Sequence, residues 1–355
     1  MVIKMLKKAY VLAIALAALV AGCGGGGGNH SALLAGRYTV AELSAPNGSS
    51  SVSARMIDNQ GRIVGCIQDP VTSMAGDTCV WQPGHVVPDV LHGDSLPSGI
   101  NNNGQGVCFD GGPGLVLNLL DGSTTQLPDI AGGGGEPWPE AINDRGVCVG
   151  SCLVSQAGSS SMQYQAVVWD EHGDATALET PDGCIGSSAE DINNSGLIVG
   201  EVTTSDGVMH AAIWSADGHL QKVITEPPGF HWSEATHVND AGEVLVDFDF
   251  NSTSGHFTYP GAAVYGPDGS FRLLARPGNR ELYTADLNVH GQVAGILDGG
   301  SAVVWNPDGS VEQFPSPHVG LFCGATGIND NGVVVGAYGP DAKNCHHAVV
   351  WTPIH

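Results

Sequence analysis

The chain has 355 residues and a formal net charge of −24. Charged residues make up 14% of it and hydrophobic residues 42%, a composition that indicates a folded protein and excludes a disordered acidic tail. A surface this acidic repels phosphate backbones, which excludes nucleic acid as a partner.

The first 22 residues resemble a bacterial export signal. Three lysines lie at the start, and an apolar stretch, residues 9–20, follows them. That stretch is too short to span a membrane as a helix. The next letters, Val20-Ala21-Gly22-Cys23, resemble a lipobox, the motif at which a lipoprotein is cleaved to leave a lipid-bearing cysteine. We therefore expect a signal peptide over residues 1–22 and a lipid anchor on Cys23.

Residues 23–36 are rich in glycine and predict a flexible tether between this anchor and the folded part. Gly24 follows the cysteine where some lipoproteins have Asp, and this resemblance implies sorting to the outer membrane. The sequence leaves open whether the protein faces the periplasm or the cell surface. Removing residues 1–22 leaves 9 basic against 36 acidic residues, a net charge of −27.

From residue 37 onward the chain repeats one pattern seven times. Each copy contains a form of Ile-Asn-Asp-x-Gly, and successive copies are 41 to 50 residues apart. This period, with no helical periodicity, is typical of propeller blades. The copies begin at Ile57, Ile100, Ile142, Ile192, Val238, Leu287 and Ile328.

Each copy predicts four short strands. The first strand ends at the Ile, and Asn-Asp-x-Gly forms a hairpin turn, because Asx side chains bond nearby amides and Gly adopts positive φ. The second strand resembles Val-Val-x-Gly and the third Ala-x-x-Trp, as at Ala211 to Trp214. Both are continuously apolar, which indicates that both of their faces are covered. We expect the Trp to fill the space between neighbouring blades, and a half-polar fourth strand to follow.

The last copy stops before its fourth strand, since only four residues follow Trp351. Residues 37–43, in contrast, predict a strand with no blade before it. Pairing the two would close a ring and remove two exposed edges. The sequence therefore predicts an all-β fold for residues 37–355, a seven-bladed β-propeller of four-stranded blades closed by an N-terminal strand. We expect it to be a monomer.

Eight cysteines remain after Cys23, and an even number in an exported chain permits disulfides. In a propeller, the connections between second and third strands lie on the same face as those between blades. On that geometry we predict three pairs: Cys66–Cys79, Cys152–Cys184 and Cys323–Cys345. No CxxC spacing is present, so the sequence does not support a zinc cluster or a thioredoxin-like site.

Four aromatic residues lie four to six positions before the end of a first strand, where the blade-to-blade connections enter the blades. They are Trp138, Trp232, Tyr283 and Phe322, and Glu140 and Glu234 lie nearby. Aromatic platforms beside carboxylates suit peptides or sugars, although rings that only cap the blades would give the same pattern. If Glu140 and Glu234 converged within about 5–10 Å, the pair would instead suit glycoside hydrolysis.

Asp247 and Asp249 begin a run of alternating oxygen ligands that resembles the start of a calcium loop. The run lacks the Gly and Glu that such a loop has at its sixth and twelfth positions. We therefore expect a long strand running into an acidic loop, with Ca²⁺ as the weaker alternative and no other cofactor.

The pattern Ile-Asn-Asp-x-Gly-x-Val-Val-Gly followed by His-Ala-x-x-Trp resembles the bacterial extracellular repeat family called HAF, over residues 37–355. Val or Ile replaces the Phe of the family's His-Ala-Phe signature. The resemblance implies export and a propeller-like fold, and it brings no catalytic residues. We predict a non-enzymatic, lipid-anchored propeller of the cell envelope that binds a protein, peptide or glycan through loops on one face. The alternative is a hydrolase or lyase of polysaccharide that uses Glu140 and Glu234.

Overall fold

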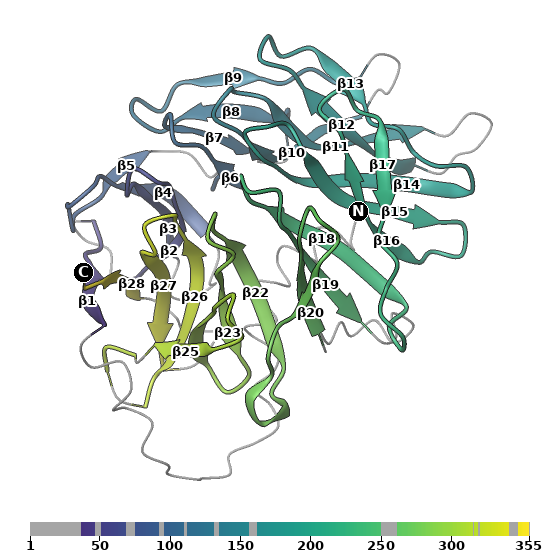
Figure 1. Ribbon diagram of the computed structural model, residues 1–355. Coiled ribbons are helices and arrows are strands. Elements are labelled where there is room, and N and C mark those ends of the chain that lie inside the picture. The colour runs from purple at the N-terminus through teal and green to yellow at the C-terminus, as the bar shows by residue number, and fades with distance from the viewer. Residues whose placement is uncertain are drawn as a thin grey trace. The chain divides into compact units, whose positions relative to one another are not determined.

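The computed structural model describes residues 37–354, except 47–50, 69–74, 92–95, 110–111, 131–134, 156–161, 250–260, 315, 319 and 341–346. The regular secondary structure of the described chain is β-strand, apart from a single 3-10 turn, η2, at Pro277–Asn279 (Figure 1). Within those residues no helix has the length and apolar character needed to cross a membrane.

The strands form seven antiparallel sheets of four, the blades of a seven-bladed β-propeller, as predicted. The chain divides into two compact units, Met1–Val90 with Ala275–His355 and Leu91–Leu274. The second unit holds blades 2 to 5. Their strands are β6 (Gly99–Ile100), β7 (Gln105–Cys108), β8 (Leu115–Asn118) and β9 (Thr124–Gln126); β10 (Pro137–Ile142), β11 (Cys148–Ser155), β12 (Met162–Trp169) and β13 (Ala175–Ala177); β14 (Cys184–Ile192), β15 (Ile198–Thr204), β16 (Met209–Trp214) and β17 (Leu220–Val223); β18 (Trp232–Val238), β19 (Val244–Asp249), β20 (Gly261–Tyr265) and β21 (Phe271–Leu273).

The first unit holds blades 1, 6 and 7. Blade 1 contains β2 (Val52–Ile57), β3 (Ile63–Gln68), β4 (Ala75–Trp81) and β5 (Asp89–Leu91), and blade 6 contains β22 (Leu282–Leu287), β23 (Val293–Leu297), β24 (Ser301–Trp305) and β25 (Val311–Phe314). Blade 7 contains β26 (Phe322–Ile328), β27 (Val334–Gly339), β28 (His347–Pro353) and the N-terminal strand β1 (Tyr38–Leu43). In it β1 runs antiparallel to β28, from Tyr38 opposite Pro353 to Leu43 opposite Ala348. The N-terminal strand thus completes the last blade, as predicted.

The Asn-Asp-x-Gly turns bond within a blade and also to the next one. In blade 4, Asn193 Oδ1 accepts hydrogen bonds from the amides of Ser195 at 3.1 Å and Leu197 at 2.9 Å, and Gly196 has a φ of 91°. Its Nδ2 donates to the carbonyl of Asn239 in blade 5 at 2.9 Å. The same donation runs from blade 2 to 3, 3 to 4, 6 to 7 and 7 to 1. The repeat motif therefore joins blades as well as turning the chain.

The hydrophobic core lies between blades. Each of five clusters of buried side chains draws on two neighbouring blades of one unit, so the second and third strands are covered on both faces, as their composition predicted. The tryptophans at or near the ends of third strands are fully buried, and four of them, Trp81, Trp169, Trp214 and Trp351, belong to these clusters. Trp169 Nε1 donates to the carbonyl of Pro128 at 2.8 Å, and Trp214 Nε1 to that of Glu179 at 2.7 Å, each after the fourth strand of the preceding blade. Each ring therefore packs and also satisfies its polar atom.

Candidate functional site

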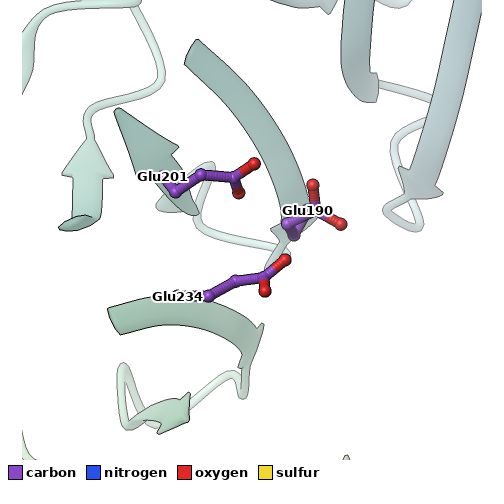
Figure 2. Close-up of side chains that lie close together, drawn as sticks. All are labelled: Glu190, Glu201 and Glu234. Atoms are coloured by element: carbon purple, nitrogen blue, oxygen red, sulfur yellow. The ribbon is translucent and has the colours of Figure 1, made fainter. Parts of the chain in front are cut away.

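Three glutamates come together at the contact of blades 4 and 5. Glu190 lies on β14, Glu201 on β15 and Glu234 on β18, and one carboxylate oxygen of each lies within 4.8 Å of the others. Figure 2 shows the carboxylates of Glu201 and Glu234 directed toward that of Glu190. Glu201 and Glu234 are buried, at 3% and 7% exposed, and Glu190 is half-buried. We refer to these three residues as the acidic group.

Strand register explains how the acidic group forms. Between β14 and β15 the pairing passes from Ala189 to Asp191, so Glu190 occupies a β-bulge and has no residue opposite it. Ser188 lies opposite Glu201, and its hydroxyl donates to Glu190 Oε1 at 2.9 Å. A β-bulge changes the direction of a side chain relative to the regular alternation of its strand, and Glu190 is the residue of β14 that lies at this bulge beside Glu201.

Sequence reasoning identified one member of the acidic group and missed the other two. Glu234 was selected as a candidate, but its expected partner Glu140 does not belong to the group. Glu140 occupies the equivalent bulge of blade 3, between Pro139 and Ala141, and is buried there. The sequence feature that could have identified the acidic group is Glu201, because it is a charged residue inside an otherwise apolar second strand.

Trp138 belongs to a strip of three aromatic side chains in blades 2 and 3. Its ring stacks on Phe109 with centroids 4.0 Å apart and planes at 22°, and meets Tyr164 edge-on at 6.3 Å. All three side chains are half-buried. Phe109 follows the second strand of blade 2, Trp138 lies at the start of the first strand of blade 3, and Tyr164 lies near the start of its third strand. In antiparallel blades these three positions lie at the same end. We refer to Phe109, Trp138 and Tyr164 as the aromatic strip.

The other predicted aromatic platforms have structural surroundings. Trp232 is 1% exposed, so its ring is not available to stack on a ligand. Tyr283 and Phe322, in the other unit, are half-buried. The Tyr283 hydroxyl donates to Glu281 Oε2 at 3.0 Å, and burial, then Glu281, raises the pKa of Tyr283. Phe322 packs against Gly300, where a Cβ atom would lie 2.1 Å from the ring.

The acidic run of blade 5 starts inside a strand. Asp247 and Asp249 both lie in β19 and are buried, opposite Glu234 and Trp232 respectively. β19 has six residues, as β3 and β27 do, so the strand described there is not longer than its equivalents. The loop that would supply the remaining calcium ligands, residues 250–260, lies outside the described residues.

Five of the six cysteines predicted to pair carry free thiols: Cys66, Cys79, Cys152, Cys184 and Cys323. Cys66 lies opposite Thr78 whereas Cys79 lies opposite Gly65, so the two thiols project to opposite faces of their sheet. Cys152 faces the backbone of Ile130 in blade 2, away from Cys184 at the start of blade 4, and burial raises the pKa of Cys152 to about 12. These two predicted disulfides are therefore not formed in the structure.

Three predicted features fall outside the described residues. They are the signal peptide over residues 1–22, the tether over residues 23–36 with the lipidation residue Cys23, and Cys345, the expected partner of Cys323.

The chain matches no protein-family model and no curated protein sequence. Several solved structures resemble it in fold. YCF48 bound to D1 peptide is 12% identical, with 89% of this chain and 97% of that chain covered and a TM-score of 0.50. A catalytically inactive virginiamycin B lyase from Staphylococcus aureus with quinupristin is 9% identical, covers 89% and 100%, and has a TM-score of 0.55. The β-propeller domain of the trilobed protease from Pyrococcus furiosus is 12% identical, covers 85% and 94%, and also has a TM-score of 0.55. At these identities the likeness shows the fold alone.

Proposed function

We propose that this chain is a non-enzymatic lipoprotein of the cell envelope, a propeller scaffold that binds a protein, peptide or glycan through one end of its blades. The observation that carries the proposal is the aromatic strip, three partly exposed rings on neighbouring blades, of which Phe109 stacks on Trp138 and Tyr164 meets Trp138 edge-on. Partly exposed aromatic rings that support one another offer a rigid apolar surface at low entropic cost, which is what peptide and sugar recognition uses.

Two exposed apolar side chains extend the surface around the aromatic strip. Met162, at the start of β12, is 47% exposed, and Ile185, at the start of β14, is 37% exposed. The backbone of Gly186 lies against Tyr164, since a Cβ atom on Gly186 would be 3.2 Å from the Tyr164 carbonyl oxygen. Exposed apolar side chains that gather at one end of neighbouring blades indicate an interaction surface, whereas single exposed apolar residues scattered over a protein do not. A propeller with a bound peptide is among the similar folds, which supports a peptide segment as one form of ligand.

The anchoring part of the proposal rests on the sequence before the first strand. The lipobox-like letters ending at Cys23 favour a lipid anchor, and the glycine-rich residues 23–36 would let the propeller move away from the membrane surface. Labelling cells with a lipid precursor tests this directly, because wild type should incorporate the label and Cys23→Ala should not. Label on both forms, or on neither, would contradict the anchor.

A binding screen tests the scaffold. The soluble form lacking residues 1–23 is presented with arrays of envelope-derived peptides, envelope proteins and glycans. We expect Trp138→Ala to weaken the recognised ligand at least about tenfold, because a central aromatic anchor typically contributes 2 kcal/mol or more. Phe271→Ala is the matched control, since Phe271 is a partly exposed aromatic on the outer strand β21. Equal losses in both variants, or no loss in either, would contradict the assignment of the aromatic strip.

The alternative, a hydrolase or lyase of polysaccharide, would need two carboxylates at one reacting bond. The acidic group supplies the required proximity, although two of its three side chains are buried. Polysaccharide cleavage that is retained by Trp138→Ala but abolished by Glu201→Gln or Glu234→Gln would favour the enzyme over the scaffold.

A further inference from the structure

The N-terminal strand β1 is fixed near its C-terminal end by a carboxylate. Glu42 Oε1 accepts a hydrogen bond from the Tyr338 hydroxyl of β27 at 2.6 Å, and His318 Nε2, in the connection between β25 and β26, lies 3.0 Å from the same oxygen. Tyr338 is 1% exposed, whereas the side chains of Glu42 and His318 are 48% and 62% exposed. One oxygen of β1 therefore joins a buried hydroxyl of blade 7 to a ring at the entrance of that blade.

Aromatic contacts hold this arrangement in place. The His347 ring, on β28, stacks on Tyr338 with centroids 4.9 Å apart and planes at 18°. The His318 ring lies 5.5 Å from Tyr338 on a tilted plane. The titratable groups that face Glu42 are therefore Tyr338 on β27, His318 before β26 and His347 on β28, with Cys323 of β26 facing Tyr338.

The other end of β1 carries a second charged contact. Arg37 Nη1 lies 2.5 Å from Glu312 Oε1 of β25, and the next residue, Tyr38, packs edge-on against Phe314 at 4.8 Å. Burial, with Glu312 as the next cause, raises the pKa of Tyr38 to about 12. Besides its backbone pairing with β28 and the packing of Tyr38 and Leu43, β1 thus has one carboxylate contact at each end.

We propose that Glu42, Tyr338 and His318 form an acid-sensitive latch, so that acid loosens β1 from the last blade while the rest of the blade stays folded. The ionised carboxylate accepts from a hydroxyl and can pair with an imidazolium, and both interactions weaken when Glu42 gains a proton. The latch acts locally because β1 is an outer strand whose neighbouring strands keep their own hydrogen bonds. The inference does not depend on the proposed binding function.

The direction of the pH effect follows from the contacts of Glu42. The hydrogen bond from Tyr338 is the largest effect and lowers the pKa of Glu42 below its ordinary 4.5. Burial opposes it as the next largest, and the hydrogen bond and charge of His318 lower the pKa further. A carboxyl whose pKa is lowered by folding stabilises the folded state above the pKa of the unfolded chain. That contribution is lost as the pH falls through the folded value, so the latch weakens below about pH 4.5.

Hydrogen exchange of the mature full chain tests the latch. Exchange of residues 37–43 is measured between about pH 3 and pH 7, corrected for the intrinsic pH dependence of exchange, with strand β24 as the internal reference. In wild type, we expect the protection of β1 relative to β24 to fall about three- to tenfold across the acidic range, because the charge-assisted hydrogen bond from Tyr338 and the contact with His318 both weaken when Glu42 gains a proton.

Two variants and a control make the outcome decisive. Glu42→Gln should have lower protection of β1 than wild type near neutral pH, match wild type at about pH 3 and so lose the acid-dependent fall. Tyr338→Phe should make that fall smaller. Glu171→Gln is the control, because Glu171 is an exposed carboxylate beside His172 at 3.8 Å and should leave the step unchanged. An unchanged acidic step in Glu42→Gln, or simultaneous loss of protection in β1 and β24, would overturn the proposal.

Discussion

Glu201 occupies a position that most blades fill with a small or apolar residue. The residue at this point of the second strand is Cys66 in blade 1, Ser151 in blade 3, Ile296 in blade 6 and Ala337 in blade 7. Only blades 4 and 5 place an acid there, Glu201 and Asp247, and both are buried. Buried carboxylates are costly unless a specific arrangement compensates them, which makes this departure from the repeat the most informative one.

We predict that Glu201→Gln stabilises the protein at neutral pH by about 1 kcal/mol, because like charges within 4.8 Å of one another oppose folding. Thermal and urea unfolding measure the change. Glu190→Gln, at a half-buried position, should show a smaller gain, since solvent screens its charge.

A loss of stability in Glu201→Gln would show that the charge is needed, as it would be if the group held a cation. Repeating the melts with Ca²⁺ and with a chelator distinguishes that outcome. A Ca²⁺-dependent rise in melting temperature that Glu201→Gln removes would favour the metal, and an unchanged melt would exclude it at this group.

At the scale of elements, the turn between first and second strands explains why the repeat is so uniform. The Asn side chain accepts hydrogen bonds from amides of its own turn and donates one to the next blade. The backbone amide of the following residue donates a hydrogen bond to that same blade. Asp144 N, for example, donates to Asn194 Oδ1 at 2.8 Å. A single short motif therefore specifies both the hairpin and the packing of blade on blade.

We expect Asn193→Ala to cost about 2–3 kcal/mol of unfolding free energy, because Asn193 is buried and its loss removes the acceptor of the Ser195 and Leu197 amides and the hydrogen bond to blade 5. Chemical denaturation measures this value. Asn103→Ala, in the turn of blade 2, is the control, since Asn103 is exposed and should cost under about 1 kcal/mol. Equal costs for the two variants would contradict the role given to the buried Asn.

At the scale of the whole molecule, β1 carries the closure of the last blade. It pairs along its full length with β28, and Leu43, at its end, packs into the hydrophobic cluster shared by blades 7 and 1. Without β1, the edge of β28 would be open to pairing with other chains.

A form beginning at residue 44 should be destabilised by at least about 3 kcal/mol relative to a form beginning at residue 37, because it loses the buried Leu43 side chain, the half-buried Tyr38 ring and a full strand pairing. Thermal melts and size-exclusion chromatography would show a lower melting temperature and self-association. A peptide spanning residues 37–46 should restore the melting temperature. Equal stability of the two forms would contradict the closure.

The sequence alone determined the number of blades, the four strands in each, their turns and the pairing of β1 with the last blade. These features follow from local rules, since hairpin turns, apolar strands and an unfinished last copy are all written in short stretches of chain. The same local reading correctly treated the tryptophans as filling between blades.

Only the tertiary structure decided which side chains meet. The bulge at Glu190 and the register of β14 on β15 formed the acidic group in place of the expected pair of Glu140 and Glu234. Register also turned Cys66 and Cys79 to opposite faces of one sheet. The physical reason is that a shift of one residue in a strand reverses the direction of a side chain, and a repeat period of 41 to 50 residues does not specify that shift.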